Sequence, residues 1–167
     1  MKKKQVLFIG RFQPFHKGHL GTIQKIAQVE DVGELIIGIG SSDKSYTSYN
    51  PFTAEEREEM IRSALKLKIP FEIKHIPDVT DNDEWTQILL EKYFDGSVIY
   101  SGNSLVIELL TKAGKEVRIP PPIENPSGTE IRQMMVENKN WEKFVPKEVA
   151  NLVKKIGGEQ ILKNFFG

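Results

Sequence analysis

The chain has 167 residues, a length typical of one domain. Its 23 Lys and Arg balance 23 Asp and Glu, which argues against a broad nucleic-acid or membrane surface but leaves room for a local basic pocket. The absence of cysteine excludes disulfides, thiolate zinc sites and cysteine nucleophiles. The apolar run at 6–9 is shorter than a signal peptide or a membrane helix requires, so we expect a cytoplasmic enzyme.

Short apolar runs alternate along the chain with longer stretches of helical periodicity. Strands are predicted at 5–9, 34–40, 71–76, 97–100 and 115–119. Helices are predicted at 16–30, from Thr53 onward, and at 82–94, 104–113, 130–138 and 146–166, the last interrupted at Gly157 and Gly158. Two capping boxes mark helix starts, Thr53 with Glu56 and Ser127 with Glu130.

The order of these elements predicts the fold class. The run at 34–40 is apolar without alternation, as expected of a strand covered on both faces. Five strand–helix alternations with short connections favour a Rossmann-like, doubly wound α/β fold, a parallel five-stranded sheet with helices on both faces. We expect a single domain over 1–167, with an α/β nucleotide-binding core at 1–140 and a helical C-terminal tail at 141–167. Ligands in such folds bind at the carboxyl ends of the strands.

The segment after the first strand, GRFQPFHKGH, is a candidate phosphate site. Gly10 ends the strand and permits a tight turn, and a helix begins near His16, where free N–H groups and the helix dipole attract anions. His16 and His19 lie on one side of the first helical turn and can donate hydrogen bonds to phosphate oxygens. Gly18 allows a ligand to approach the backbone closely. A structural histidine pair and a metal site stay open as alternatives, although a closed zinc site needs about four donors.

The segment after the last strand, PSGTEIR, is the second candidate. It places Ser127 and Thr129 at a helix start and Arg132 one turn in. Capping explains Ser127 but not Arg132, because a cation in the first turn opposes the helix dipole. A bound anion would offset that unfavourable interaction.

The segments after the third and fourth strands carry weaker signals. Trp85 either stacks on a flat ring of a ligand or belongs to the core. Three nearby carboxylates either form turns in solvent or contact ligand hydroxyl or amide groups: Asp78, Asp81 and Asp83. The tripeptide SGN at 101–103 is compatible with a simple turn.

Two of these segments together resemble the signatures of the HxGH nucleotidyltransferase superfamily. HKGH at 16–19 has the HxGH form, and SGTEIR at 127–132 is similar to the superfamily's ISGTxIR motif. The letters GRFQPFH, with NPFTAEER at 50–57 and YSGNSLV at 100–106, resemble the archaeal-type nicotinamide-nucleotide adenylyltransferases. The resemblance runs from about residue 6 to residue 160. One departure is the loop at 48–50, which lacks the arginine that some members carry there.

The resemblance implies adenylyl transfer from ATP to nicotinamide mononucleotide (NMN), giving NAD and pyrophosphate, with Mg²⁺ bridging phosphates and waters. The catalytic residues that it implies are His16, His19, Arg132 and Arg11. The ATP-binding residues that it implies are Gly10, Arg11, Phe12, Gln13, His16, His19, Gly102, Asn103, Ser127, Thr129 and Arg132. The NMN-binding residues that it implies are Trp85, Asn82, Gly40 and Ser41. The NMN 5′-phosphate is already ionised near neutral pH, so the attack needs no general base.

The resemblance also implies a homo-oligomer, a hexamer in the archaeal-type enzymes, with the small molecules ATP, NMN, NAD and pyrophosphate as the partners. From the balanced charge we expect neither nucleic acid nor membrane as a partner. Three alternatives stay open. The first is a nucleotidyltransferase for another phosphate acceptor, such as a pantetheine or flavin compound. The second is a nucleotide-sensing domain without catalysis, and the third is a zinc protein that uses His16 and His19.

Overall fold

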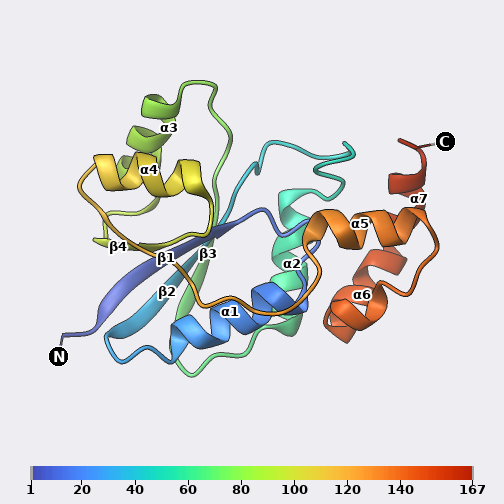
Figure 1. The fold of residues 1–167 in the computed structure, drawn as a ribbon, viewed down its shortest axis with the longest axis horizontal. Coiled ribbons are helices and arrows are strands. Elements are labelled where there is room, and N and C mark those ends of the chain that lie inside the picture. The colour runs from blue at the N-terminus through green and yellow to red at the C-terminus, as the bar shows by residue number, and fades with distance from the viewer. Residues whose placement is uncertain (1, 167) are drawn as a thin grey trace.

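A computed structural model describes residues 2–166, and its centre is a five-stranded parallel sheet of order β3-β2-β1-β4-β5 (Figure 1). The strands are β1 (Lys4–Gly10), β2 (Val32–Ile39), β3 (Phe71–His75), β4 (Val98–Tyr100) and β5 (Glu116–Arg118). The helices are α1 (Lys17–Ala27), α2 (Ala54–Ala64), α3 (Asn82–Ile88), η1 (Leu89–Tyr93), α4 (Ser104–Lys112), α5 (Gly128–Val136), η2 (Glu142–Phe144), α6 (Lys147–Lys155) and α7 (Gly158–Lys163). The predicted fold class, a doubly wound parallel α/β fold, is confirmed.

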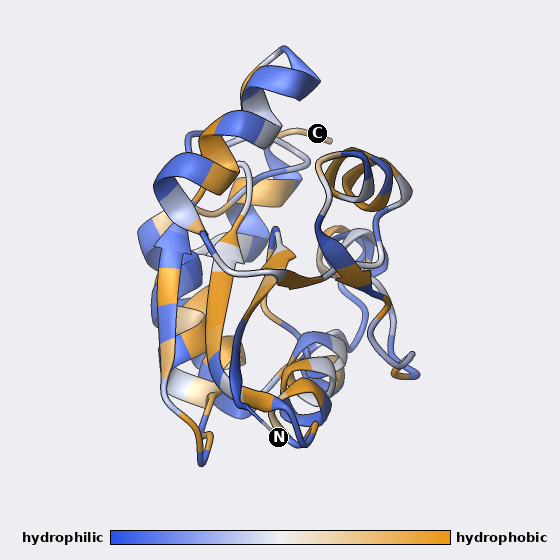
Figure 2. Ribbon diagram, turned by 90° about the vertical axis from the view of Figure 1, so that its left-hand side faces the viewer, coloured by the Kyte–Doolittle hydropathy of each residue, from blue (hydrophilic) through white to orange (hydrophobic). Residues whose placement is uncertain are grey.

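Alternate residues of the central strands enter two separate hydrophobic clusters. Val6 and Phe8 of β1 pack in a cluster shared with α1, α2, α5, α6 and α7, whereas Leu7 packs in a cluster with η1 and α4. In β4, Val98 belongs to the first cluster and Ile99 to the second. In Figure 2 the inner strands of the sheet carry long orange stretches, whereas the outer strands alternate orange with blue. Because helices cover both faces, the buried strands are apolar without alternation.

Several predicted boundaries were wrong. The helix predicted at 82–94 is α-helical only to Ile88 and continues as the π-helix η1, where the Phe94 N–H donates to the Leu89 carbonyl at 2.9 Å. This wider turn places both Leu89 and Phe94 in the second hydrophobic cluster. The strand predicted from residue 115 begins at Glu116, because the Lys115 N–H caps α4 by donating to the Leu110 carbonyl at 3.0 Å.

Two predicted helix starts and the predicted break in the C-terminal helix are confirmed. Thr53 and Ser127 are the N-caps of α2 and α5, each in a reciprocal capping box with the glutamate three residues later. The tail breaks at Gly157, whose φ of 70° is left-handed and separates α6 from α7. None of the helices in the described part of the chain is both long and apolar enough to span a membrane.

The connection from β5 to α5 crosses the molecule. It runs from the edge of the sheet past α1 (Figure 1), and a Cβ on Gly21 of α1 would lie only 3.2 Å from Ile123. Through this close approach the chain returns from the edge strand to the carboxyl end of β1. The predicted division into core and tail stays a prediction, although α6 and α7 pack against α2 and α5.

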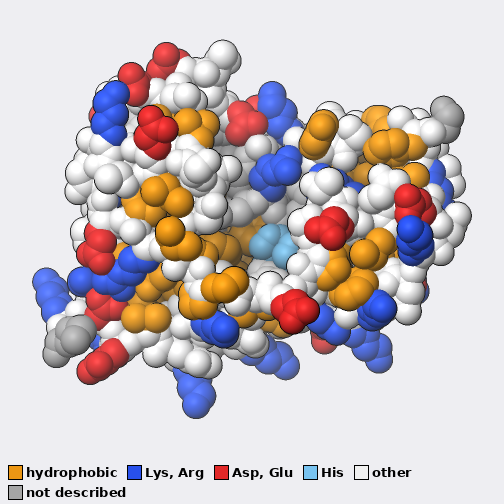
Figure 3. Space-filling model, in the orientation of Figure 1, with side chains coloured by type: hydrophobic (Ala, Val, Ile, Leu, Met, Phe, Trp, Pro, Cys, Tyr) orange, Lys and Arg blue, Asp and Glu red, His pale blue; other side chains and the backbone are white. Residues whose placement is uncertain are grey.

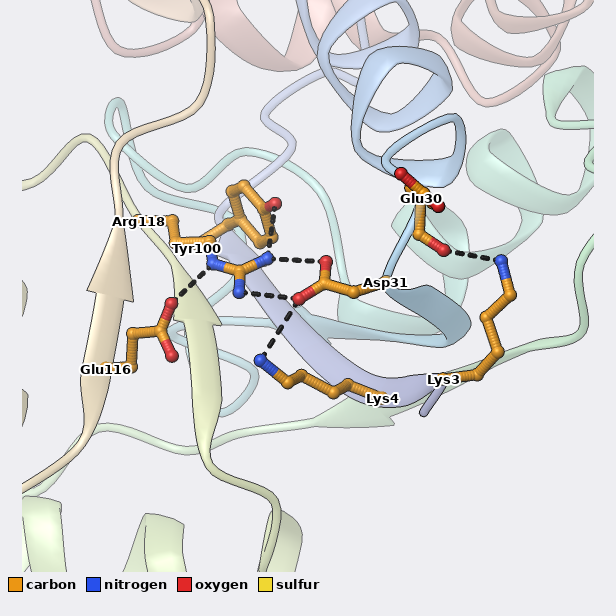
Figure 4. Close-up of polar contacts among 7 residues, drawn as sticks. All are labelled: Lys3, Lys4, Glu30, Asp31, Tyr100, Glu116 and Arg118. Atoms are coloured by element: carbon orange, nitrogen blue, oxygen red, sulfur yellow. Dashed lines mark hydrogen bonds and ion pairs between the residues drawn. The ribbon is translucent and has the colours of Figure 1, made fainter. Parts of the chain in front are cut away.

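A cluster of paired charges joins β1, β5 and the start of β2 (Figure 4). Asp31 accepts two hydrogen bonds from Arg118, at 2.9 and 2.8 Å, and its carboxylate lies 3.0 Å from Lys4 Nζ. Arg118 also pairs with Glu116 at 2.7 Å and reaches the Tyr100 hydroxyl at 3.4 Å. Hydrogen bonds from Arg118 and Lys4 hold the pKa of Asp31 well below its usual range. This cluster links β1, β5 and the start of β2 through ion pairs, and its positive and negative charges balance.

Candidate active site

A cavity of about 390 Å³ lies at the carboxyl ends of β1, β2 and β4. β1 and β4 are neighbours in the sheet, but α1 and α4, which follow them, belong to opposite faces. This is the switch point at which doubly wound folds bind ligands. Of the sequence-predicted residues, those that line the cavity are Gly10, Arg11, Gly40, Ser41, Asn82, Trp85 and Asn103. Figure 3 shows a hollow in the middle of one face, with a histidine on its floor and a basic side chain beside it.

The four residues predicted for NMN all line this one cavity. Gly40 and Ser41 follow β2, and Asn82 and Trp85 lie on α3. Trp85 also packs against the second hydrophobic cluster, so it belongs partly to the core and partly to the cavity wall. Leu105, Val106 and Leu109 of α4 contribute an apolar part of the cavity wall.

Asp78 is a lining residue that sequence analysis left undecided. Its carboxylate accepts a hydrogen bond from the Ser41 hydroxyl at 3.1 Å, and its own N–H donates to Asp43 at 2.8 Å. Asp81 instead caps α3 by accepting from the Glu84 N–H at 2.8 Å. Of the three carboxylates singled out in this loop, only Asp78 lines the cavity.

His16 and His19 cap α1 reciprocally. The His19 N–H donates to His16 Nδ1 and the His16 N–H donates to His19 Nδ1, both at 3.2 Å. The two rings are stacked, with centroids 3.6 Å apart. The Asn125 side chain lies 3.4 Å from His16 Nδ1, so that atom faces two donors. A structural histidine pair was one of the alternatives kept open from the sequence, but the reciprocal cap was not predicted, because Ser, Thr, Asp and Asn are the usual helix caps.

This capping arrangement sets the tautomer of both rings. An Nδ1 that accepts a hydrogen bond carries no proton, so each neutral imidazole holds its proton on Nε2. Burial lowers the pKa of His16 to about 4, and burial together with the neighbouring His16 lowers the pKa of His19. Both rings are therefore neutral at pH 7. Each presents one Nε2–H donor, and no acceptor for it is found within residues 2–166.

Two glycines of this segment make room for neighbouring aromatic rings. A Cβ on Gly18 would lie 2.8 Å from the His16 ring, and a Cβ on Gly10 would lie 2.8 Å from the Phe12 ring. The left-handed residue of the turn is Phe12, with φ of 54°. Gly18 therefore leaves room for the stacked histidine pair, and Gly10 accommodates the Phe12 ring that packs edge-on against His19 at 4.8 Å.

Arg132 joins the two motif segments. It is 5% exposed, and its guanidinium donates to the Gln13 carbonyl at 2.8 Å and to the Thr129 hydroxyl at 3.2 Å. A Cβ on Gly128 would lie 3.2 Å from Arg132 Nη1, so a glycine leaves space for this contact. Burial, and then the nearby Arg11, lower the pKa of Arg132 to about 10. The guanidinium is still charged at neutral pH.

The remaining residues predicted to bind ATP lie in several different surroundings, and not all of them face the main cavity. The Gln13 side chain is buried and pairs twice with the Phe52 backbone, at 3.0 Å each, so only its backbone faces Arg132. The Ser127 hydroxyl is engaged in the α5 cap. Gly102 is exposed, and nothing lies within 4 Å of where its Cβ would be. Thr129 and Arg132 line a second, smaller hollow of about 230 Å³ rather than the main cavity.

Comparison with known proteins identifies the family. The cytidylyltransferase-like family matches residues 7–134. Proteins described as nicotinamide-nucleotide adenylyltransferases are 44% identical in Methanosarcina mazei, over 96% of this chain and 93% of that protein, and 43% identical in Methanococcus aeolicus, over 95% and 93%. The chain belongs to the archaeal-type nicotinamide-nucleotide adenylyltransferases. A further relative in Saccharolobus solfataricus is 40% identical over 96% of both chains.

A solved structure agrees with this family. A bifunctional NMN adenylyltransferase/ADP-ribose pyrophosphatase from Francisella tularensis, in complex with AMP and a manganese ion, superposes with a TM-score of 0.76 at 25% identity. The alignment covers 99% of this chain but 52% of the other, so the chain spans about half of that protein's length.

The described side chains of this adenylyltransferase offer no closed metal site. Within residues 2–166 no three His, Asp or Glu side chains lie together as ligands. The alternative of a zinc protein therefore finds no third ligand beside His16 and His19 in this part of the chain. A divalent ion in this family would have to be held largely by groups that the ligand supplies.

Arg57 is a residue of the family's site region that sequence analysis passed over. It is fully buried beneath the loops that follow β1 and β2, and it donates to the carbonyls of Arg11 and Gly40, at 3.0 and 2.8 Å. In sequence it stands among four glutamates of α2, a pattern that indicates a solvated helix face. No local signal distinguishes it from an exposed arginine.

Proposed function

We propose that the chain transfers the adenylyl group of ATP to NMN, giving NAD and pyrophosphate, and so acts in NAD biosynthesis. The observation that carries the proposal is the bond from Arg132 to the Gln13 carbonyl at 2.8 Å. It joins segments 119 residues apart, so that a neutral histidine pair and an uncompensated arginine stand together beside the switch-point cavity. Such a group of donors suits the triphosphate of a nucleotide.

The phosphate contacts follow from the donors that are present. His16 and His19 would donate their Nε2–H groups to the α- and β-phosphates, and Arg132 and Arg11 would supply positive charge. Neither arginine has a carboxylate within 4.0 Å among residues 2–166. N–H groups in the first turns of α1, which begins at Lys17, and of α5, which begins at Gly128, add further donors. The unprotonated imidazoles hydrogen-bond without the desolvation penalty of a buried charge.

The nucleoside and acceptor would occupy the cavity itself. The open space beside Gly102 and the Asn103 cap of α4 suit the adenosine end. Trp85 offers an aromatic surface for the nicotinamide ring, with Asn82 on the same helix and Gly40 and Ser41 across the cavity.

The chemistry is an in-line displacement. An oxygen of the NMN 5′-phosphate forms a bond to the α-phosphorus of ATP, and the bond from that phosphorus to the α–β bridging oxygen breaks. Pyrophosphate leaves with the electron pair, and no protein nucleophile or base is required. The protein contributes alignment of the two phosphates and hydrogen bonds to the charge that develops on the α- and β-phosphates. Mg²⁺ that accompanies ATP would help to neutralise the phosphate charge, and it would be held mainly by the substrate rather than by side chains of this chain.

The direct test is an acceptor panel. Purified protein is incubated with Mg²⁺-ATP and with NMN, nicotinate mononucleotide, phosphopantetheine or flavin mononucleotide, while pyrophosphate release and product mass are measured together. We expect NAD and stoichiometric pyrophosphate with NMN. No product with either pyridine mononucleotide would overturn the proposal. Light scattering of the same sample tests the expected hexamer, which stays a prediction.

A further inference from the structure

Arg57 has an unusual set of partners for a fully buried cation. It is 0% exposed, and all five of its N–H groups donate to backbone carbonyls. The accepting carbonyls belong to Arg11, Gly40, Ser41, Lys44 and Thr53, at 3.0, 2.8, 3.1, 3.4 and 3.1 Å. These residues come from the loop after β1, the loop after β2 and the start of α2.

The positive charge of Arg57 is not neutralised by a pair. No carboxylate lies within 4.0 Å of it in the described chain. Removal from water lowers its pKa to about 10, with the nearby Arg11 as the next cause. A buried ion without a charged partner is expensive in free energy, whereas an apolar side chain would fill the same volume but leave five carbonyls without these donors. Packing alone therefore does not account for an arginine here.

The two shortest bonds of Arg57 connect the two halves of the cavity. A single nitrogen, Nη1, donates both to the Arg11 carbonyl and to the Gly40 carbonyl. Arg11 belongs to the half that would hold the ATP phosphates, and Gly40 belongs to the half that would hold the acceptor. The second nitrogen, Nη2, continues along the acceptor half to Ser41.

We propose that Arg57 is a positioning residue that sets the spacing between the two substrate sites. The proposal rests on the proposed function, because the spacing matters only if one bound phosphate must attack another. Displacements of about 1 Å at a reacting pair can lower a rate about a hundredfold. The planar fork of an arginine can bridge several carbonyls at once, which the single ammonium of a lysine cannot reproduce.

The test separates binding of each substrate from their reaction. In Arg57→Lys we expect kcat to fall at least about tenfold, while the dissociation constants of Mg²⁺-ATP alone and of NMN alone, measured by calorimetry, stay within about threefold. The matched control is Arg62→Lys on the same helix. Arg62 is exposed and pairs with Glu58 at 2.9 Å, so its kcat should match that of the wild type.

Chemical rescue gives a second readout. In Arg57→Ala, millimolar guanidinium should restore part of kcat, and it should leave the wild type and Arg62→Ala unchanged. A merely structural role would lower the melting temperature of Arg57→Lys and leave the kcat of the folded protein intact, and that result would overturn the spacing role. Inactive wild-type protein would instead overturn the proposed function, and the spacing role with it.

Discussion

Two regions of this molecule use buried or half-buried arginines in opposite ways. Arg118, near the edge of the sheet, shares the carboxylate of Asp31 through two hydrogen bonds, and this pairing raises its pKa (Figure 4). Arg132 and Arg57, at the carboxyl ends of the strands, contact only carbonyl and hydroxyl oxygens, and burial lowers the pKa of each to about 10. In the first region, which we call the paired region, the charge of Arg118 is balanced by a carboxylate. In the second, which we call the uncompensated region, the charges of Arg132 and Arg57 have no carboxylate partner in the described part of the chain.

The difference indicates where an anion is expected. Two opposite charges that pair with each other stabilise the fold, and they leave little free charge with which to bind a ligand. Unpaired buried cations reduce stability, and they persist where a ligand with negative charge offsets their desolvation. Each prediction below tests whether function follows the uncompensated region and stability follows the paired one.

The largest effect is expected for the histidine pair. His19→Ala removes an Nε2–H donor from the uncompensated region, and kcat should fall by about 10² to 10³, while the dissociation constant for ATP changes much less. Steady-state kinetics and ATP titration measure the two quantities. The control is His75→Ala, whose imidazole pairs with Glu58 at 2.7 Å outside the cavity and should leave kcat unchanged. Equal turnover of His19→Ala and the wild type would remove His19 from the mechanism.

The next effect concerns the pH dependence of stability. His16 has its pKa lowered from 6.5 to about 4 by burial, so between these values the unfolded chain binds more protons than the folded one. The free energy of unfolding therefore falls as pH decreases from 6.5 to 4, by about 3 kcal/mol from His16. His16→Asn retains a capping oxygen and should reduce this slope in urea-unfolding curves measured at several pH values.

The paired region around Asp31 should affect the free energy of unfolding in a different pH range. Asp31 has its pKa held below the usual value of 3.8, so its stabilising contribution is present above that pH and is lost as pH falls below it. Asp31→Asn should flatten the stability curve only below about pH 4. An Asp31→Asn protein that loses the slope between pH 6.5 and 4 would contradict the assignment of these windows.

The smallest expected effect on activity comes from replacing an arginine by lysine, once in the uncompensated region and once in the paired region. Arg132→Lys should lower kcat/KM by roughly ten- to a hundredfold, the range of a charge-assisted hydrogen bond, with little change in melting temperature. Arg118→Lys replaces a two-point pair with Asp31 and should lower the melting temperature with kcat/KM unchanged. If both variants lost activity equally, the distinction between the two regions would fail.

Much of the fold could be predicted from the sequence, because its signals are local. The buried strands are apolar on successive residues, and the capping boxes at Thr53 and Ser127 need only residues three apart. The placement of a site after the first and last strands follows from the rule for doubly wound sheets. The π-helical turn at Leu89 and the start of β5 at Glu116 were missed, because each depends on which carbonyl a single N–H reaches.

The candidate site could be predicted only in outline. The residue types at His16, His19 and Arg132 indicated an anion site, but the reciprocal cap that leaves Nε2–H as the free donor was not foreseen. Gly10 was assigned to the turn and Gly18 to the approach of a ligand, and the structure adds that both leave room for a ring, of Phe12 and of His16 respectively.

By itself, the sequence determined the alternation of strands and helices, the helix starts and the absence of cysteine chemistry, all of which depend on neighbouring residues or on composition. The tertiary structure alone decided which cations are neutralised. Arg57 lies among glutamates in sequence, yet in the fold it contacts five carbonyls and no carboxylate within 4.0 Å in the chain as described. Burial and charge pairing are properties of contacts between distant segments, so no local pattern can specify them.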